Sequence, residues 1–149
     1  MSTTTPAIRS VKARAVVAPI SRPVKNAFGV IDSAPLVLID VATDLGISGR
    51  AYIFAYTSLT LKPLVHLIEQ IGLGLVGKPV APFDLMAEMD RKFRLLSWQG
   101  LVGMAVSGLD RAFWDALGHV AGRPLAWIRA FTASRSRAAT AMPPMTSEL

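Results

Sequence analysis

The feature of this sequence that most restricts its fold is a stripe of small and apolar residues between positions 101 and 120. Its members recur at helical spacing and would share one side of a helix: Leu101, Ala105, Gly108, Leu109, Ala112, Ala116 and Val120. Small side chains in such a stripe allow a neighbouring element to approach closely. Gly122 favours a left-handed helix end, and Pro124 could not continue the helix. The sequence therefore predicts a long, tightly packed helix that ends at Gly122.

Three β-type segments come earlier in the chain. From Ser10 the residues alternate, with Val11, Ala13, Ala15 and Val17 on one side of a half-buried strand. The runs APLVLIDVAT (34–43) and GISGRAYIFAYT (46–57) follow, joined by a tight turn at Asp44 and Gly46. Two such runs are typical of an antiparallel hairpin. Together the segments predict a three-stranded antiparallel sheet.

Between the first two strands lies a connection, ISRPVKNAFGVIDS (20–33), in which we find neither a helix nor a strand pattern. It is punctuated by Pro23, Asn26 and Gly29, with Pro19 just before it. Long loops in compact domains are often functional. We therefore expect a functional loop here.

Two further helices are predicted between the sheet and the long helix that contains the stripe. Apolar residues at Leu61, Leu64 and Ile68 have helical spacing, and Pro63 places the helix start or a kink near it. A second helix is expected over DLMAEMDRKFRLL (84–96), with Asp84 as its cap. The fold class is thus α+β, a three-stranded antiparallel sheet followed by a helical bundle. From about Thr132 the chain has no period, and we expect a disordered C-terminal tail.

Composition limits the classes of protein that this chain can be. Its 149 residues suffice for one domain with a core. Hydrophobic residues make up 52% and charged residues 17%, against about 45–50% and about 25% in typical proteins, so we expect part of the surface to be covered by another domain or subunit. No run approaches the roughly 18 apolar residues of a membrane span. The basic start and the lack of cysteine favour the cytoplasm.

The net charge of +6 raises the question of nucleic-acid binding. The first 31 residues hold five basic residues and no acidic one: Arg9, Lys12, Arg14, Arg22 and Lys25. They are spread over a strand and a loop, with no aromatic platform between them on which bases could stack. We therefore expect neither a nucleic-acid partner nor a membrane partner.

A metal site is not predicted from the sequence. The two histidines, His66 and His119, belong to different predicted helices, and there is no cysteine. His66 and Glu69 could share a helix face, but two ligands fall short of a protein metal site. His119, near a helix C-terminus, is expected to interact with the negative end of the helix dipole.

Catalytic groups are not apparent either. Asp110 and Asp115 are five positions apart, about 140° around a helix axis, so they point to different sides and cannot act as a pair. Arg111 is expected to pair with Asp115 on the helix surface. The chain contains no G-x-S-x-G elbow and no phosphate loop. The residues alone indicate a scaffold with no catalytic residue.

The sequence nevertheless resembles a known family. The segments are RAVVAPISRPVKNAFGVIDSAPLVLIDVAT (14–43), FAYT (54–57) and GLVGMAVSGLDRAFWDALGHVAGRPL (100–125). They are similar to the amino-terminal capping domain of the mandelate racemase and muconate lactonizing enzyme family, in the enolase superfamily. The motif D-x-A-x-W-D-x-x-G, here starting at Asp110, is characteristic of that domain. The resemblance covers about residues 8–125 and is strongest to the mandelate racemase-like members.

The resemblance implies that the cap and a second domain have different roles. Family members abstract the proton α to a carboxylate and stabilise the product on Mg²⁺, using acid–base and metal groups of a (β/α) barrel that follows the cap. The cap supplies a lid over the barrel mouth. Carried over by position, the lid runs from Arg22 to Asp32, and the residues near the substrate are Val24, Phe28, Ile31 and Tyr56. The implied partners are the barrel, like subunits and a small carboxylate substrate.

The family pattern stops after Pro124, where AWIRAFTASRSRAAT follows instead of an apolar turn and a glycine pair. We therefore expect a flexible start (1–7), a capping domain (8–125) and an aberrant tail (126–149) without the barrel, from a frameshifted or truncated gene. On this interpretation the chain is not active alone. The alternative is a stand-alone protein-binding or assembly module that keeps its helical face for a partner.

Overall fold

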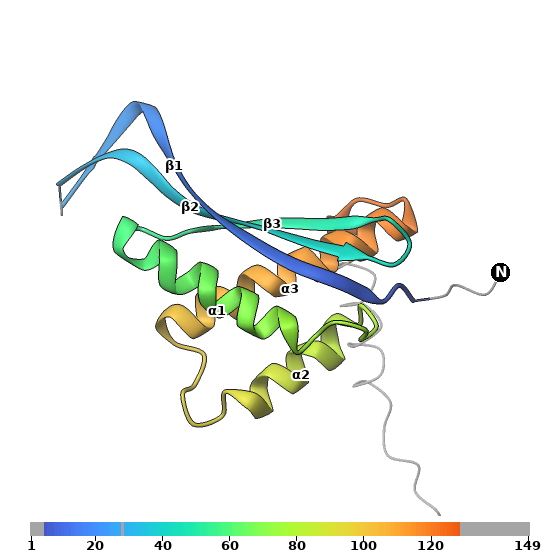
Figure 1. The fold of residues 1–149 in the computed structure, drawn as a ribbon. Helices are drawn as coiled ribbons and strands as arrows, with labels where there is room; N and C mark the ends of the chain where they lie inside the picture. The colour runs from blue at the N-terminus through green and yellow to red at the C-terminus, as the bar shows by residue number, and fades with distance from the viewer. Residues whose placement is uncertain (1–4, 28, 129–149) are drawn as a thin grey trace, which may run out of the picture.

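The predicted sheet is present in the computed structural model, which describes residues 5–27 and 29–128. It consists of β1 (Ile8–Asn26), β2 (Gly29–Thr43) and β3 (Ser48–Phe54), in the order β1-β2-β3 and antiparallel throughout. The turn between β2 and β3 is closed by hydrogen bonds from Thr43 N to Ile47 O (2.9 Å) and from Gly46 N to Thr43 O (3.2 Å). Gly46 has a φ of 74°, a conformation that glycine adopts without strain. The α+β fold class is confirmed (Figure 1).

The expected loop over residues 20–33 is wrong, because β1 and β2 continue through it as a long hairpin. Pairing runs from Pro19 opposite Ser33, through a register shift, to Val24 opposite Ile31. The prolines are tolerated because β1 is an edge strand, where a missing N–H need not break a ladder. The hairpin extends past the helices (Figure 1). The projecting part of the hairpin, residues 20–33, therefore lacks the alternation of apolar and polar residues that burial of one face would impose.

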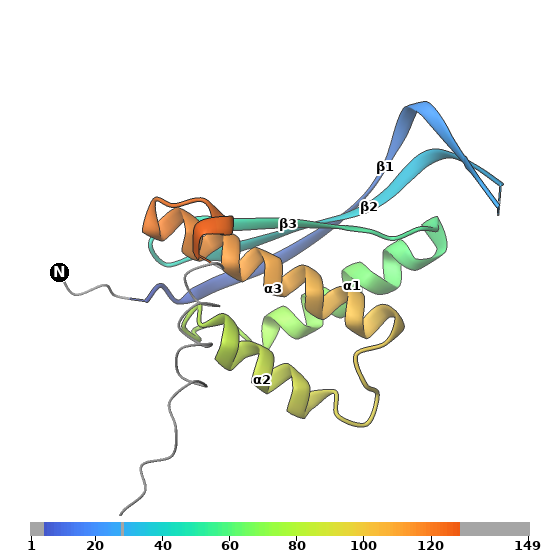
Figure 2. The same ribbon diagram turned by 180° about the vertical axis from the view of Figure 1, so that it is seen from behind.

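The three long helices lie on one side of the sheet, and the first and third of them pack against its face (Figures 1 and 2). Val37, Ile39 and Val41 of β2 point into this layer and are at most 1% exposed. The longest helix, α3 (Gly100–Ala121), packs its predicted stripe here, with Ala105, Leu109, Ala112 and Ala116 among the buried residues. It ends as predicted at Gly122, whose φ is 58°.

The two shorter helices complete the core. Helix α1 (Leu61–Leu73) carries Pro63 in its first turn, as expected, and follows a short 3₁₀ helix, η1 (Ser58–Thr60). Helix α2 (Pro82–Lys92) begins two residues earlier than predicted, because Pro82 has the backbone angle that a first helical position needs. Asp84 is therefore not the cap but an acidic residue of the first turn. The helix also ends at Lys92, short of the predicted Leu96.

The described part of the chain ends in one further helical turn after Pro124, where Trp127 N donates to Pro124 O at 3.0 Å. The Arg123 guanidinium lies over the Trp127 ring, 5.2 Å from its centroid. The predicted disordered tail, from about Thr132, lies outside the described residues. None of the described helices is long and apolar enough to cross a membrane.

Candidate functional site

The structure brings two of the four predicted lid residues together. Val24 of β1 and Ile31 of β2 are direct partners across the hairpin, so their side chains share one face. Val24 is 54% exposed and Ile31 is half-buried. Phe28 lies outside the described residues. The opposite face of the hairpin carries the next pair, Lys25 and Val30.

The fourth predicted residue, Tyr56, lies two residues beyond the end of β3. The preceding residue is anchored to the sheet by a hydrogen bond from Ala55 N to Pro35 O (2.8 Å). Tyr56 has a φ of 60°, uncommon for a residue with a side chain, and is 79% exposed. Its ring meets Phe54 edge-on at 4.9 Å between centroids. Because β3 ends beside Pro35 and the hairpin continues beyond it, Tyr56 and the hairpin lie at the same end of the sheet.

A groove beside Tyr56 was not predicted from the sequence. It has a volume of about 440 Å³ and lies between β3 and the first half of α3. Tyr52, Tyr56 and Trp98 supply aromatic groups, and Arg111 supplies a cation. Ser97, next to Trp98, is the second non-glycine residue of the described chain with a positive φ, at 62°. Two sparsely populated backbone conformations thus flank one groove, a clustering that often marks functional surfaces.

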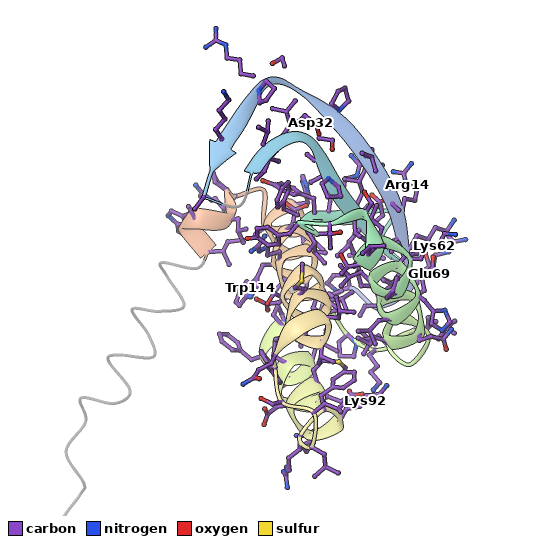
Figure 3. The ribbon with its side chains drawn as sticks, turned by 90° about the vertical axis from the view of Figure 1, so that its left-hand side faces the viewer. Arg14, Asp32, Lys62, Glu69, Lys92 and Trp114 are labelled. Atoms are coloured by element: carbon purple, nitrogen blue, oxygen red, sulfur yellow. The ribbon has the colours of Figure 1, made fainter. Side chains whose placement is uncertain are left out.

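Within the characteristic motif at positions 110–118, Asp115 joins α3 to β3. Asp115 Oδ2 accepts a hydrogen bond from Arg50 N at 2.8 Å and lies 3.4 Å from His119 Nε2. The expected pairing of Asp115 with Arg111 is therefore replaced by these two contacts. Trp114, labelled on α3 in Figure 3, is 8% exposed and meets Phe83 edge-on at 5.3 Å.

Removing the Asp115 carboxylate should weaken the contact between α3 and β3. We expect Asp115→Ala to lower the free energy of unfolding by about 1–3 kcal/mol, because a charge-assisted hydrogen bond to a backbone N–H is lost. Urea unfolding followed by circular dichroism measures this change. Asp115→Asn keeps one acceptor oxygen and should cost less. Unchanged stability, with unchanged hydrogen exchange at the Arg50 amide, would contradict the assignment.

Among the described residues, two further sets of charged side chains form ion pairs. Asp40, on the sheet face opposite the helices, lies 3.5 Å from Arg14 and 3.3 Å from Arg50. Glu88 pairs with Lys78 at 2.6 Å. Among the described residues, no three His, Cys, Asp or Glu side chains gather into a group that could hold a metal ion.

Comparison with known proteins identifies the domain. Residues 8–128 match the family described as mandelate racemase / muconate lactonizing enzyme, N-terminal domain. The chain belongs to this family. The matched range includes every element described above, from β1 to the end of α3. The resemblance inferred from the sequence is thus confirmed for the family and for the domain.

Solved structures of enolase-superfamily enzymes have the same fold. An enolase from Bradyrhizobium, complexed with magnesium and mandelic acid, is 65% identical over 87% of this chain, with a TM-score of 0.82. An enolase from an alphaproteobacterium, BAL199, with bound magnesium is 35% identical over 83% of the chain, with a TM-score of 0.78. L-talarate/galactarate dehydratase from Salmonella typhimurium LT2 is 19% identical with a TM-score of 0.72, a likeness of fold alone. The chain spans 36% of the Bradyrhizobium protein and 34% of the second.

Proposed function

We propose that this domain is the lid of a Mg²⁺-dependent, mandelate racemase-like enzyme that abstracts the proton α to a carboxylate, as a racemase or a dehydratase. The observation that carries the proposal is the hairpin, which places Val24 and Ile31 side by side beyond the helices. The 65% identity to an enolase that holds magnesium and mandelic acid supports the choice of chemistry.

The lid acts through its apolar face. When the hairpin closes over a reaction site, Val24 and Ile31, together with the predicted Phe28, exclude water and lower the local dielectric around a charged intermediate. The same face accommodates the aryl or alkyl part of a substrate. Tyr56 borders the site from the end of β3, where its exposed hydroxyl is free to reach a bound molecule.

The acid–base and metal-binding groups are assigned to a barrel, which corresponds to the larger part of the relatives' length. The described residues of this chain do not gather a set of metal ligands, so no chemical step is assigned to a metal held by them. Mg²⁺ bound by the barrel would stabilise the enediolate formed on proton abstraction. On this proposal, residues 1–149 alone exchange no α proton.

A chimera tests the proposal directly. Residues 8–125 of this chain would replace the matching cap of the Bradyrhizobium enolase, and exchange of the α proton of mandelate would be followed by NMR in deuterated buffer with Mg²⁺. We expect exchange by the chimera. The double variant Val24→Ser, Ile31→Ser should reduce kcat/KM about 10-fold or more, because a polar, wetter wall weakens binding in the closed state.

Val30→Ser is the matched control for the double variant. Val30 lies on the same hairpin and is 59% exposed, close to the 54% of Val24, but it points to the opposite face. It should change kcat/KM by less than about twofold. Equal losses for the control and the double variant would show that the hairpin acts only through its stability. If the chimera kept its full kcat/KM in the double variant as well as in the control, the proposal that the hairpin acts as a lid would be contradicted.

A further inference from the structure

Tyr56 is the central residue of a tight, strained turn. Thr57 N donates to Ala55 O at 2.7 Å, which closes a turn of three residues around Tyr56. With the positive φ of Tyr56, 60°, this is the rare and strained form of the γ-turn. A residue stays in such a conformation only where its surroundings hold it there. The groups that hold this turn therefore decide how Tyr56 is presented.

The Thr60 hydroxyl ties together the two ends of this turn. Its oxygen lies 3.0 Å from Ala55 O and 2.9 Å from Thr57 O, and its single hydrogen is shared between these two acceptors. The backbone of Thr60 adds a third contact, from its N–H to Thr57 O at 3.3 Å. One residue thus contacts the carbonyl groups on both sides of Tyr56.

The place of Thr60 in the chain makes this use of its hydroxyl unusual. Thr60 is the N-cap residue of α1, where a threonine side chain normally accepts a hydrogen bond from the first turn of the helix. Thr60 makes no such bond to α1, all of whose residues are described. The hydroxyl is therefore committed to the turn at Tyr56 rather than to the helix.

The turn also sets the direction of the Tyr56 side chain. Ala55 is 2% exposed and its N–H donates to Pro35 O at 2.8 Å, so the turn starts from a fixed point of the sheet. Tyr56 itself is 79% exposed, and its ring meets Phe54 edge-on. Because so much of Tyr56 is exposed, its backbone rather than burial in the core restrains it. Figure 1 shows the connection from β3 to α1 at the end of the sheet from which the hairpin projects.

We propose that Thr60 is a positioning residue: its hydroxyl keeps the strained turn closed and so holds Tyr56 in place before a substrate binds. The inference rests on the proposed function, in which Tyr56 borders the reaction site. A side chain that is already in place loses less conformational freedom on binding, so the affinity for the substrate is higher. Thr60 is not among the residues that the family resemblance assigns to the site.

The first test measures the order of the turn in the 149-residue chain by ¹⁵N relaxation. We expect an order parameter of about 0.85 for the Tyr56 amide in the parent protein and of about 0.6 or less in Thr60→Val, which has a side chain of similar shape without the hydroxyl. The Thr57 amide, which donates across the turn, should exchange faster with solvent in this variant. Thr60→Ser keeps the hydroxyl and should restore both values.

Thr43→Val is the matched control. The Thr43 hydroxyl also donates to a backbone carbonyl, that of Ile47 at 2.8 Å, but it does so in the turn at the opposite end of the sheet. Because Thr43 is 1% exposed, this variant should lower the urea midpoint of unfolding at least as much as Thr60→Val, while the Tyr56 amide stays as in the parent. An unchanged order parameter in Thr60→Val, or an equal loss of order in Thr43→Val, would overturn the proposal.

The second test uses the chimera with the Bradyrhizobium enolase and mandelate as substrate. We expect Thr60→Val to raise KM about threefold or more, with a change in kcat of less than about twofold, and Thr60→Ser to leave both near the parent values. In a Tyr56→Ala background, Thr60→Val should raise KM no further, since the two residues act through one contact. An equal rise in both backgrounds would show that Thr60 acts without Tyr56, and the proposal would be wrong.

The two tests also separate this inference from the proposed function. If Tyr56→Ala alone left KM unchanged, Tyr56 would not border the reaction site, and positioning it would serve no purpose. That result would refute the role of Tyr56 in the lid and the role of Thr60 with it, even if the order parameters changed as expected. Loss of order in Thr60→Val together with a non-additive rise in KM supports the proposal.

Discussion

Gly49→Val is expected to remove most of the stability of this domain. A Cβ atom at Gly49 would overlap the backbone oxygen of Ala112 and lie 2.6 Å from Ala116 N. Both are backbone atoms of α3 and cannot swing aside as the end of a side chain can. Separating α3 from β3 would open the core, so we expect a loss of more than about 3 kcal/mol. Urea unfolding monitored by circular dichroism measures it.

Gly74→Ala is the matched control for this prediction. Gly74 ends α1 with an ordinary helical φ of −76°, and a Cβ there would meet its nearest atoms at 3.5 and 3.6 Å. Such a site accepts alanine, and reduced freedom of the unfolded chain should change stability by about +0.4 to +1 kcal/mol. If Gly49→Val unfolded at the same urea concentration as the parent protein, the close packing of α3 on β3 would be refuted.

The sequence predicted those parts of the fold that depend on burial of one face. Val11 and Ala13 alternate because one side of β1 faces the helices, and the α3 stripe recurs because one side faces the sheet. The hairpin beyond Pro19 could not be recognised, since neither of its faces is packed against the helices. The start of α2 was misplaced because the backbone preference of Pro82 outweighed the capping capacity of Asp84.

The candidate site was predictable only in part, for a related reason. Val24, Ile31 and Tyr56 were assigned from the family pattern, and the structure adds that Val24 and Ile31 are direct cross-strand partners. The groove between β3 and α3 depends on which strand is at the edge and on which helix packs next to it. These are tertiary relations between residues such as Tyr52 and Arg111, 59 positions apart in the chain, and no local pattern encodes them.

Phe113→Ala should be comparably damaging, although the predicted stripe did not include Phe113. Helix α3 contacts β2 and β3 on one side and α1 and α2 on others, so it is buried over more than one stripe. Phe113 is 0% exposed within the core cluster, and its truncation should cost about 3–5 kcal/mol through lost burial and a residual cavity. Thermal and urea unfolding measure the loss.

Phe83→Ala is the control. It removes the same atoms from a residue that is 64% exposed and meets the Trp114 ring edge-on, and it should cost less than about 1.5 kcal/mol. Equal effects of the two substitutions would mean that α3 is not enclosed by the sheet and its neighbouring helices.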